Sequence, residues 1–126
     1  MEASVPLPLA VYTVAVCCEH GAGMERDPET AFALYQVLNF AEARYSLGRC
    51  YELGIGTAPD AVLAFRAYDK TAQQGFPAAQ YALGRCYENG IGVRQDIERA
   101  RKWYKRAGKG GSAEGEEAYK RLCALR

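Results

Sequence analysis

The stretch Ala-Glu-Ala-Arg-Tyr-Ser-Leu-Gly-Arg-Cys-Tyr-Glu, residues 41–52, returns 36 residues later as Pro-Ala-Ala-Gln-Tyr-Ala-Leu-Gly-Arg-Cys-Tyr-Glu, residues 77–88. After each copy come one further residue and the tripeptide Gly-Ile-Gly. A period of this length is the signature of a stacked repeat protein, in which each unit buries its apolar face only against its neighbours. The repetition therefore predicts a repeat fold, and it specifies a surface without naming what binds there.

A third, degenerate copy lies upstream, where Tyr12 and Cys17 align with the second unit at a distance of 33 residues. This first unit is three residues short between Tyr35 and Phe40, so its second helix is predicted to be truncated, from about Pro28 to Leu38. The sequence thus predicts one domain over residues 1–126, with units at about 9–40, 41–76 and 77–111 and a terminal helix at about 113–125.

Each unit reads as two helices. In the second unit, Ala43, Leu47 and Tyr51 recur at i, i+4 and i+8 and form one apolar stripe. The Gly-x-Gly after each first helix ends it, because glycine accepts a left-handed conformation. An aspartate then stands at each N-cap position of the second helix: Asp27, Asp60 and Asp96. Gly48 and Gly84 lie inside first helices, where we expect the paired helix to approach closely.

Apolar stripes on the second helices are predicted at Ala31/Leu34/Tyr35, Ala64/Ala67/Tyr68 and Ala100/Trp103/Tyr104. The third unit carries, in order, Ala79, Leu83, Gly84, Tyr87, Gly90, Gly92, Val93, Asp96, Ala100, Trp103, Tyr104, Ala107 and Gly111. This pattern resembles the Sel1-like repeat family, a relative of the tetratricopeptide repeat. The resemblance implies an all-α fold, a right-handed α-solenoid of antiparallel helix pairs, here with a C-terminal capping helix.

Composition is ordinary for a globular domain, with 25% charged and 49% hydrophobic residues. Residues 1–60 hold three arginines against eight acidic residues, and residues 61–126 hold thirteen basic against seven acidic ones. This asymmetry either steers a partner or reflects two differently solvated ends. The apolar stretch Val5–Cys18 is too short to span a bilayer. We read it as a structural helix rather than a signal segment, because no basic residue precedes it.

Five cysteines are present, and we expect Cys50 and Cys86 to stay unpaired because equivalent helices in a stack lie roughly 8–10 Å apart. Unpaired buried cysteines are typical of a reducing compartment, so a cytoplasmic location is predicted. Adjacent Cys17 and Cys18, with the lone His20, do not converge as tetrahedral metal ligands need to. No metal site, cofactor or catalytic residue is predicted.

The basic segment Arg99–Lys109 contains two aromatic residues. It reads either as a nucleic-acid-binding stretch or as the solvated outer face of a second helix. We favour the second interpretation, because Trp103 and Tyr104 are core positions in the family that the chain resembles. Neither nucleic acid nor a membrane is therefore predicted as a partner.

The face of the first helix opposite Leu47 carries a repeated set of side chains, at about 140–200° around the helix. In the families that the chain resembles, this helix lines the concave side. The predicted partner-binding residues are Tyr45, Arg49, Glu52, Tyr81, Arg85 and Glu88. Tyrosine and arginine are favoured interface anchors. Arg49 and Glu52, three residues apart, could instead simply pair with each other.

The predicted function is a non-enzymatic adaptor module that binds a peptide or helix of another protein in this groove. One alternative is a hydrolase of the cysteine-rich, β-lactam-binding branch that the resemblance brings in, although paired cysteines and a catalytic cluster are missing here. The other alternative is a structural fragment of a longer repeat array. The oligomeric state does not follow from the sequence.

Overall fold

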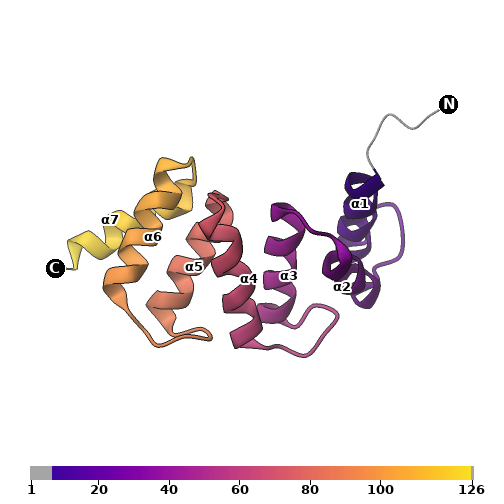
Figure 1. The fold of residues 1–126 in the computed structure, drawn as a ribbon, viewed down its shortest axis with the longest axis horizontal. Helices are drawn as coiled ribbons and strands as arrows, with labels where there is room; N and C mark the ends of the chain where they lie inside the picture. The colour runs from indigo at the N-terminus through magenta and orange to yellow at the C-terminus, as the bar shows by residue number, and fades with distance from the viewer. Residues whose placement is uncertain (1–6, 126) are drawn as a thin grey trace. The chain divides into compact units, whose positions relative to one another are not determined.

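The computed structural model describes residues 7–125. Within that range the chain forms seven α-helices and no strand, which confirms the predicted all-α class. Figure 1 shows them in chain order as α1 (Leu7–His20), α2 (Pro28–Val37), α3 (Ala41–Leu53), α4 (Ala61–Gln73), α5 (Pro77–Asn89), α6 (Ile97–Lys109) and α7 (Ala113–Ala124). The apolar stretch read as a helix over Val5–Cys18 forms most of α1, and its first two residues lie outside the described range.

The chain divides into two compact units, Met1–Pro59 and Asp60–Arg126. Unit 1 holds α1, α2 and α3, and unit 2 holds α4 to α7. The boundary falls inside the second sequence repeat, between its two helices. The single domain predicted over residues 1–126 stays a prediction.

Helix ends follow the predicted chemistry. Asp27 accepts a hydrogen bond from Thr30 N at 3.2 Å, and the carboxylates of Asp60 and Asp96 accept the equivalent bond at 3.1 Å in their own helices. Each aspartate thereby satisfies a backbone N–H that has no partner within the helix. At the other end, Gly54 and Gly90 adopt the left-handed conformation with φ of 75° and 71°, as helix termination by glycine requires.

The second glycine of the Gly-x-Gly in the second and third repeats allows close packing, a role that the sequence analysis did not predict. A Cβ atom on Gly56 would lie 2.1 Å from the carbonyl oxygen of Pro28, at the start of α2. A Cβ atom on Gly92 would lie at the same distance from the carbonyl oxygen of Ala61, at the start of α4. The loop of one repeat thus packs directly on the backbone of the preceding second helix. Gly23, the equivalent residue of the first repeat, has nothing within 4 Å of such an atom.

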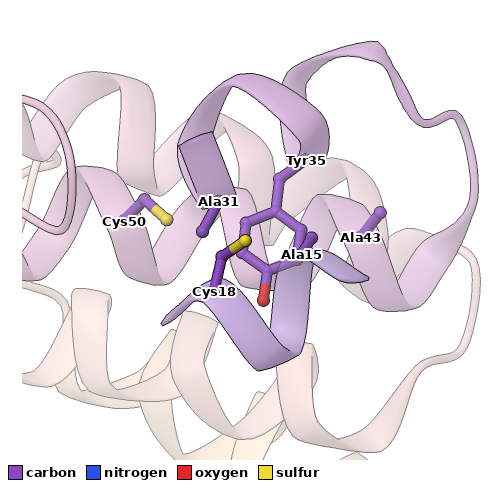
Figure 2. Packing of buried hydrophobic residues seen from close by; sticks show 6 residues of the cluster. All are labelled: Ala15, Cys18, Ala31, Tyr35, Ala43 and Cys50. Carbon is purple, nitrogen blue, oxygen red and sulfur yellow. The ribbon is translucent and has the colours of Figure 1, made fainter. Parts of the chain in front are cut away.

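The core of unit 1 is built on one tyrosine surrounded by small residues. Figure 2 shows the ring of Tyr35 among Ala15 and Cys18 of α1, Ala31 of its own helix, and Ala43 and Cys50 of α3. Tyr35 keeps 1% of its surface exposed. Alanines allow the helices to approach closely enough to enclose the ring, and the aromatic side chain buries a large apolar surface there.

The short second helix predicted for the first repeat is confirmed. Helix α2 has 10 residues, whereas α4 and α6 have 13 each. Its stripe is also narrower than predicted, because Leu34 is only half-buried while Ala31 and Tyr35 are buried. Tyr12 compensates in part, since its ring lies edge-on to Phe40 at 5.5 Å and also contacts Tyr35.

Unit 2 repeats this design in a more complete form. In Figure 1, α5 lies between α4 and α6 and contacts both. A Cβ atom on Gly84 would lie 2.6 Å from the ring of Tyr104, which confirms the close approach predicted for this glycine. Leu83 and Tyr104 are buried, whereas Trp103, predicted as a core residue, is only half-buried. The side of α6 that carries Trp103 is therefore not fully covered.

Helix α7 occupies the place of a further first helix, although its sequence repeats the pattern poorly. It packs on α6, where a Cβ atom on Gly115 would lie 2.6 Å from the side chain of Ala107. Gly115 and Leu122 are buried and stand 36 residues after Ala79 and Cys86. The predicted capping helix is thus a partial fourth repeat.

A comparison of Gly56 with Gly23 distinguishes the stability cost of backbone conformation from that of close packing. Both have positive φ, 73° and 75°, but only Gly56 faces a neighbouring backbone. We expect Gly23→Ala to cost about 1–2 kcal/mol, the price of a left-handed alanine. Gly56→Ala should cost about 1–3 kcal/mol more, because the added methyl group must displace the start of α2. Urea unfolding followed by circular dichroism measures both, and equal losses would contradict the packing role.

Candidate functional site

The six predicted binding residues lie on the first helices of the second and third repeats. Three lie on α3 in unit 1 and three on α5 in unit 2, and every one of them is half-buried rather than exposed. Two of them, Arg49 and Glu88, take part in ion pairs that join helices within a unit.

Arg49 is held by a carboxylate of the preceding repeat. Its guanidinium forms a two-point ion pair with Glu19, with Nη1 donating to Oε1 at 3.3 Å and Nη2 donating to Oε2. The hydroxyl of Tyr35 donates to the same carboxylate at 2.8 Å. Only 4% of the Glu19 side chain is exposed. This cluster, which we call the Glu19 clasp (Glu19, Tyr35 and Arg49), ties together all three helices of unit 1.

Unit 2 contains the same arrangement. Glu88 accepts a hydrogen bond from the hydroxyl of Tyr104 at 2.6 Å, and Arg121 of α7 donates to both carboxylate oxygens at 2.7 and 3.0 Å. We call these three residues the Glu88 clasp. Arg121 is more accessible than Arg49, with 52% of its side chain exposed against 25%. The Glu88 clasp therefore lies at the surface, whereas the Glu19 clasp is inside its unit.

Sequence reasoning missed four members of these clasps, namely Glu19, Tyr35, Tyr104 and Arg121. The signal was present in two spacings that were not combined. A glutamate precedes a tyrosine by 16 residues in each of the three sequence repeats, at Glu19/Tyr35, Glu52/Tyr68 and Glu88/Tyr104. An arginine recurs every 36 residues, at Arg49, Arg85 and Arg121. The alternative pairing of Arg49 with Glu52 is not the ion pair that the structure forms for Arg49, which binds Glu19.

The clasps fix the charge states of their members. Burial raises the pKa of Glu19, but the hydrogen bonds from Arg49 and Tyr35 outweigh it and leave the pKa below its ordinary value. The hydrogen bond from Arg121 lowers the pKa of Glu88 in the same way. Burial and the adjacent carboxylate raise the pKa of Tyr35, and of Tyr104 likewise, well above the usual range. At neutral pH both carboxylates are ionised and both tyrosines are neutral donors.

A cleft in unit 2 lies beside the Glu88 clasp. Its volume is about 450 Å³. The cleft in unit 2 is lined by Tyr81, Glu114, Glu117, Ala118 and Arg121. The ring of Tyr81 lies 5.6 Å from that of Tyr104, and the guanidinium of Arg85 lies 6.0 Å from the centre of the Tyr81 ring. An aromatic wall with charges of both signs suits a segment of polypeptide.

Groups that could perform chemistry are dispersed. Across residues 7–125, no three His, Cys, Asp or Glu side chains gather as metal ligands would. All five cysteines are free thiols, as expected for Cys50 and Cys86. Burial raises the pKa of Cys50 to about 11, which makes it a poor nucleophile at neutral pH. His20 lies 3.8 Å from Glu19 at the exposed end of α1. None of the described helices has the length and apolar character needed to cross a membrane.

The Glu19 clasp predicts how stability depends on pH. A carboxylate whose pKa is lower in the folded state than the unfolded value, ordinarily about 4.5, stabilises the fold fully above that value. This contribution is lost as pH falls through the folded-state pKa. We therefore expect the free energy of unfolding to decline below about pH 4.5, and Glu19→Gln to reduce the steepness of the decline. Urea titrations at a series of pH values measure this slope.

At pH 7, Glu19→Gln should also cost about 1–3 kcal/mol, because Arg49 loses its charged partner. Glu25→Gln is the matched control, since Glu25 is exposed and belongs to neither clasp. A pH dependence that Glu19→Gln and Glu25→Gln change to the same extent would argue against the clasp as its origin.

Comparison with known proteins agrees with this architecture. The Sel1 repeat family model matches three segments, residues 8–37, 41–76 and 77–112. The first segment contains α1 and α2 almost entirely, the second contains α3 and α4, and the third contains α5 and α6. No curated protein sequence matches the chain.

Several solved structures share the fold. A Sel1 repeat protein from Oxalobacter formigenes is 28% identical, with a TM-score of 0.84 over 89% of this chain and 47% of its own. A protective antigen of uropathogenic Escherichia coli strains that displays an SLR fold is 27% identical, with a TM-score of 0.81 over 86% of this chain and 24% of its own. The cysteine rich protein B of Helicobacter pylori is 18% identical, with a TM-score of 0.69 over 92% of this chain and 99% of its own. This likeness concerns the fold alone.

The chain thus spans about half of the first of these proteins and about a quarter of the second. Their helical repeats confirm the α-solenoid class predicted for the fold. Sel1 repeats generally act as protein-interaction modules, and their fold is typically a non-catalytic scaffold. With three segments that match the family model, this chain belongs to the Sel1 repeat family.

Proposed function

We propose that this protein is a non-enzymatic adaptor that binds a peptide or helix of another protein through its first-helix residues. The observation that carries the proposal is the cleft of unit 2, where the half-buried ring of Tyr81 forms one wall. A partly exposed aromatic ring, backed by a second ring and flanked by a guanidinium, is the arrangement that supplies affinity at protein interfaces.

The predicted binding residues divide into two roles under this proposal. Arg49 and Glu88 are engaged in the clasps, so their main task is to fix the positions of the helices. Tyr45, Glu52, Tyr81 and Arg85 would supply the contacts with a partner. Removal of a clasp residue should then affect binding through the fold, whereas removal of a contact residue should affect binding directly.

The hydrolase alternative gains no support from any described side chain. It rested on a branch of the family with paired cysteines, and all five cysteines are free. The likeness to the cysteine rich protein B of Helicobacter pylori extends to the fold alone. A structural role within a longer repeat array is compatible with the greater lengths of the first two structural relatives. A cytoplasmic location stays a prediction.

Site-specific photo-crosslinking tests the proposed surface. A benzophenone amino acid at position 81 should capture a protein partner in cells, while the same amino acid at position 36, an exposed site on α2, should not. Mass spectrometry then identifies the captured protein. A partner captured equally well from both positions, or from position 36 alone, would contradict the proposed site.

Affinity measurements with the identified and purified partner then distinguish the loss of a direct contact from the loss of stability. Arg85→Ala and Tyr81→Ala should each weaken binding by about tenfold or more, the size expected for an interface anchor. Leu83→Ala is the control, because Leu83 is buried and its truncation should cost about 2–5 kcal/mol of stability without removing a contact. Isothermal titration well below the melting temperature of each variant distinguishes these effects. Unchanged affinity in Arg85→Ala and Tyr81→Ala would remove the proposal.

A further inference from the structure

A second cleft in unit 2 is formed by other residues altogether. It has a volume of about 270 Å³ and is lined by Gln73, Tyr87, Arg99, Lys102, Trp103 and Arg106. It shares no lining residue with the cleft beside Tyr81. Its four positions on α6 include Trp103, the residue that the core leaves half-covered. We call these six residues the basic cleft. Four of them belong to the basic segment Arg99–Lys109 noted in the sequence.

Aromatic rings hold the guanidinium groups of the basic cleft in place. The Arg106 guanidinium carbon lies 4.5 Å from the centre of the Trp103 ring. The Arg99 guanidinium carbon lies 5.7 Å from the centre of the Tyr87 ring. A guanidinium held over an aromatic ring by a cation–π contact still has N–H groups that can donate hydrogen bonds to a ligand. Such donors match the two oxygens of a carboxylate.

The basic cleft has an excess of positive charge that the fold neutralises only at Arg99. No carboxylate is among its lining residues. Within residues 7–125, Lys102 and Arg106 form no ion pair, and Arg99 pairs only with the partly exposed N-cap residue Asp96, at 3.5 Å. Gln73, at the rim, donates a hydrogen bond to Asp69 of its own helix at 3.1 Å. An anionic partner therefore meets three cations that repel one another in its absence.

The same geometry disfavours nucleic acid. Binding of single strands relies on bases that stack on open aromatic faces. The two rings of the basic cleft are half-buried or buried, and each already has a guanidinium against one face. The chain as a whole carries a net charge of only +1. Carboxylates need only hydrogen bonds from the guanidinium N–H groups, which can still donate beside a cation–π contact.

We propose that the basic cleft binds an acidic segment of a partner protein, with carboxylates on Arg99, Lys102 and Arg106 and an apolar side chain against the edge of Trp103. This is a binding site separate from the one beside Tyr81, and it does not depend on the function proposed for that surface. The first-helix face would recognise one segment of polypeptide, and the second-helix face would select for acidic sequence.

The preceding repeat supplies a matched control. The residues 36 positions before Lys102 and Arg106 are Arg66 and Lys70, both exposed on α4 and both basic. The positions equivalent to Trp103 and Arg99 hold Ala67 and Leu63 instead. Helix α4 therefore has the same two charges without the stacked guanidinium groups. Neutralising the pair on either helix changes the net charge of the protein equally.

Peptide binding tests the basic cleft, and Trp103 reports on it because it is the only tryptophan of the chain. The probe is a fluorescein-labelled nonapeptide of alternating glutamate and leucine, and the comparison peptide has glutamine in place of glutamate. We expect the glutamate peptide to bind, with a change in anisotropy and, unlabelled, in tryptophan emission. Lys102→Gln/Arg106→Gln should weaken binding at least tenfold. Arg66→Gln/Lys70→Gln should leave it within twofold.

Several results would overturn the proposal. These are equal weakening by the two double variants, equal affinity for the glutamine peptide, binding without a change in tryptophan emission, and tighter binding of a twelve-residue oligothymidylate than of the glutamate peptide. Circular dichroism melting verifies that each variant is folded. Should Lys102→Gln/Arg106→Gln fail to fold, Lys102→Gln alone serves, because this exposed side chain forms no ion pair among the described residues and its removal should still weaken binding severalfold.

Discussion

The contact on which this structure depends is that between the tyrosine of a second helix and the first helices around it. The rings of Tyr35 and Tyr104 are almost fully buried, and both hydroxyls donate to a glutamate at the end of the preceding first helix. Small residues lie close to these rings, alanines in unit 1 and Gly84 in unit 2. Burial of a polar hydroxyl is tolerable only with a partner, so the glutamate is part of the same constraint.

That constraint decides what the arginines do. The glutamate that accepts from each buried tyrosine also meets a cation, which Arg49 and Arg121 supply from the next helix that takes the first-helix place. The clasp thereby links consecutive repeats by charge as well as by apolar packing. Arg49, predicted as a binding residue from its position on the helix, also takes part in this ion pair within the fold.

Two surfaces with different chemistry result from one repeated scaffold. Beside the Glu88 clasp, Tyr81 faces a cleft with charges of both signs, which suits a mixed polypeptide segment. On α6, where the core leaves Trp103 half-covered, stacked guanidinium groups form a cleft of a single sign. The repeat fixes where side chains stand, and residues that break the repeat, such as Trp103 and Arg99, make the cleft on α6 differ from the equivalent face of α4.

The sequence by itself determined the helices, their caps and their number, because these depend on residues a few positions apart: the aspartate at Asp96 bonds three residues ahead, and Gly90 ends its helix where it stands. The 36-residue period also identified the repeat family. Only the tertiary structure decided which of the charged side chains predicted at the surface form ion pairs between helices. Arg49 meets Glu19 across 30 residues of sequence. Such a pair exists because stacked helices bring distant charges together, and no local pattern encodes that distance.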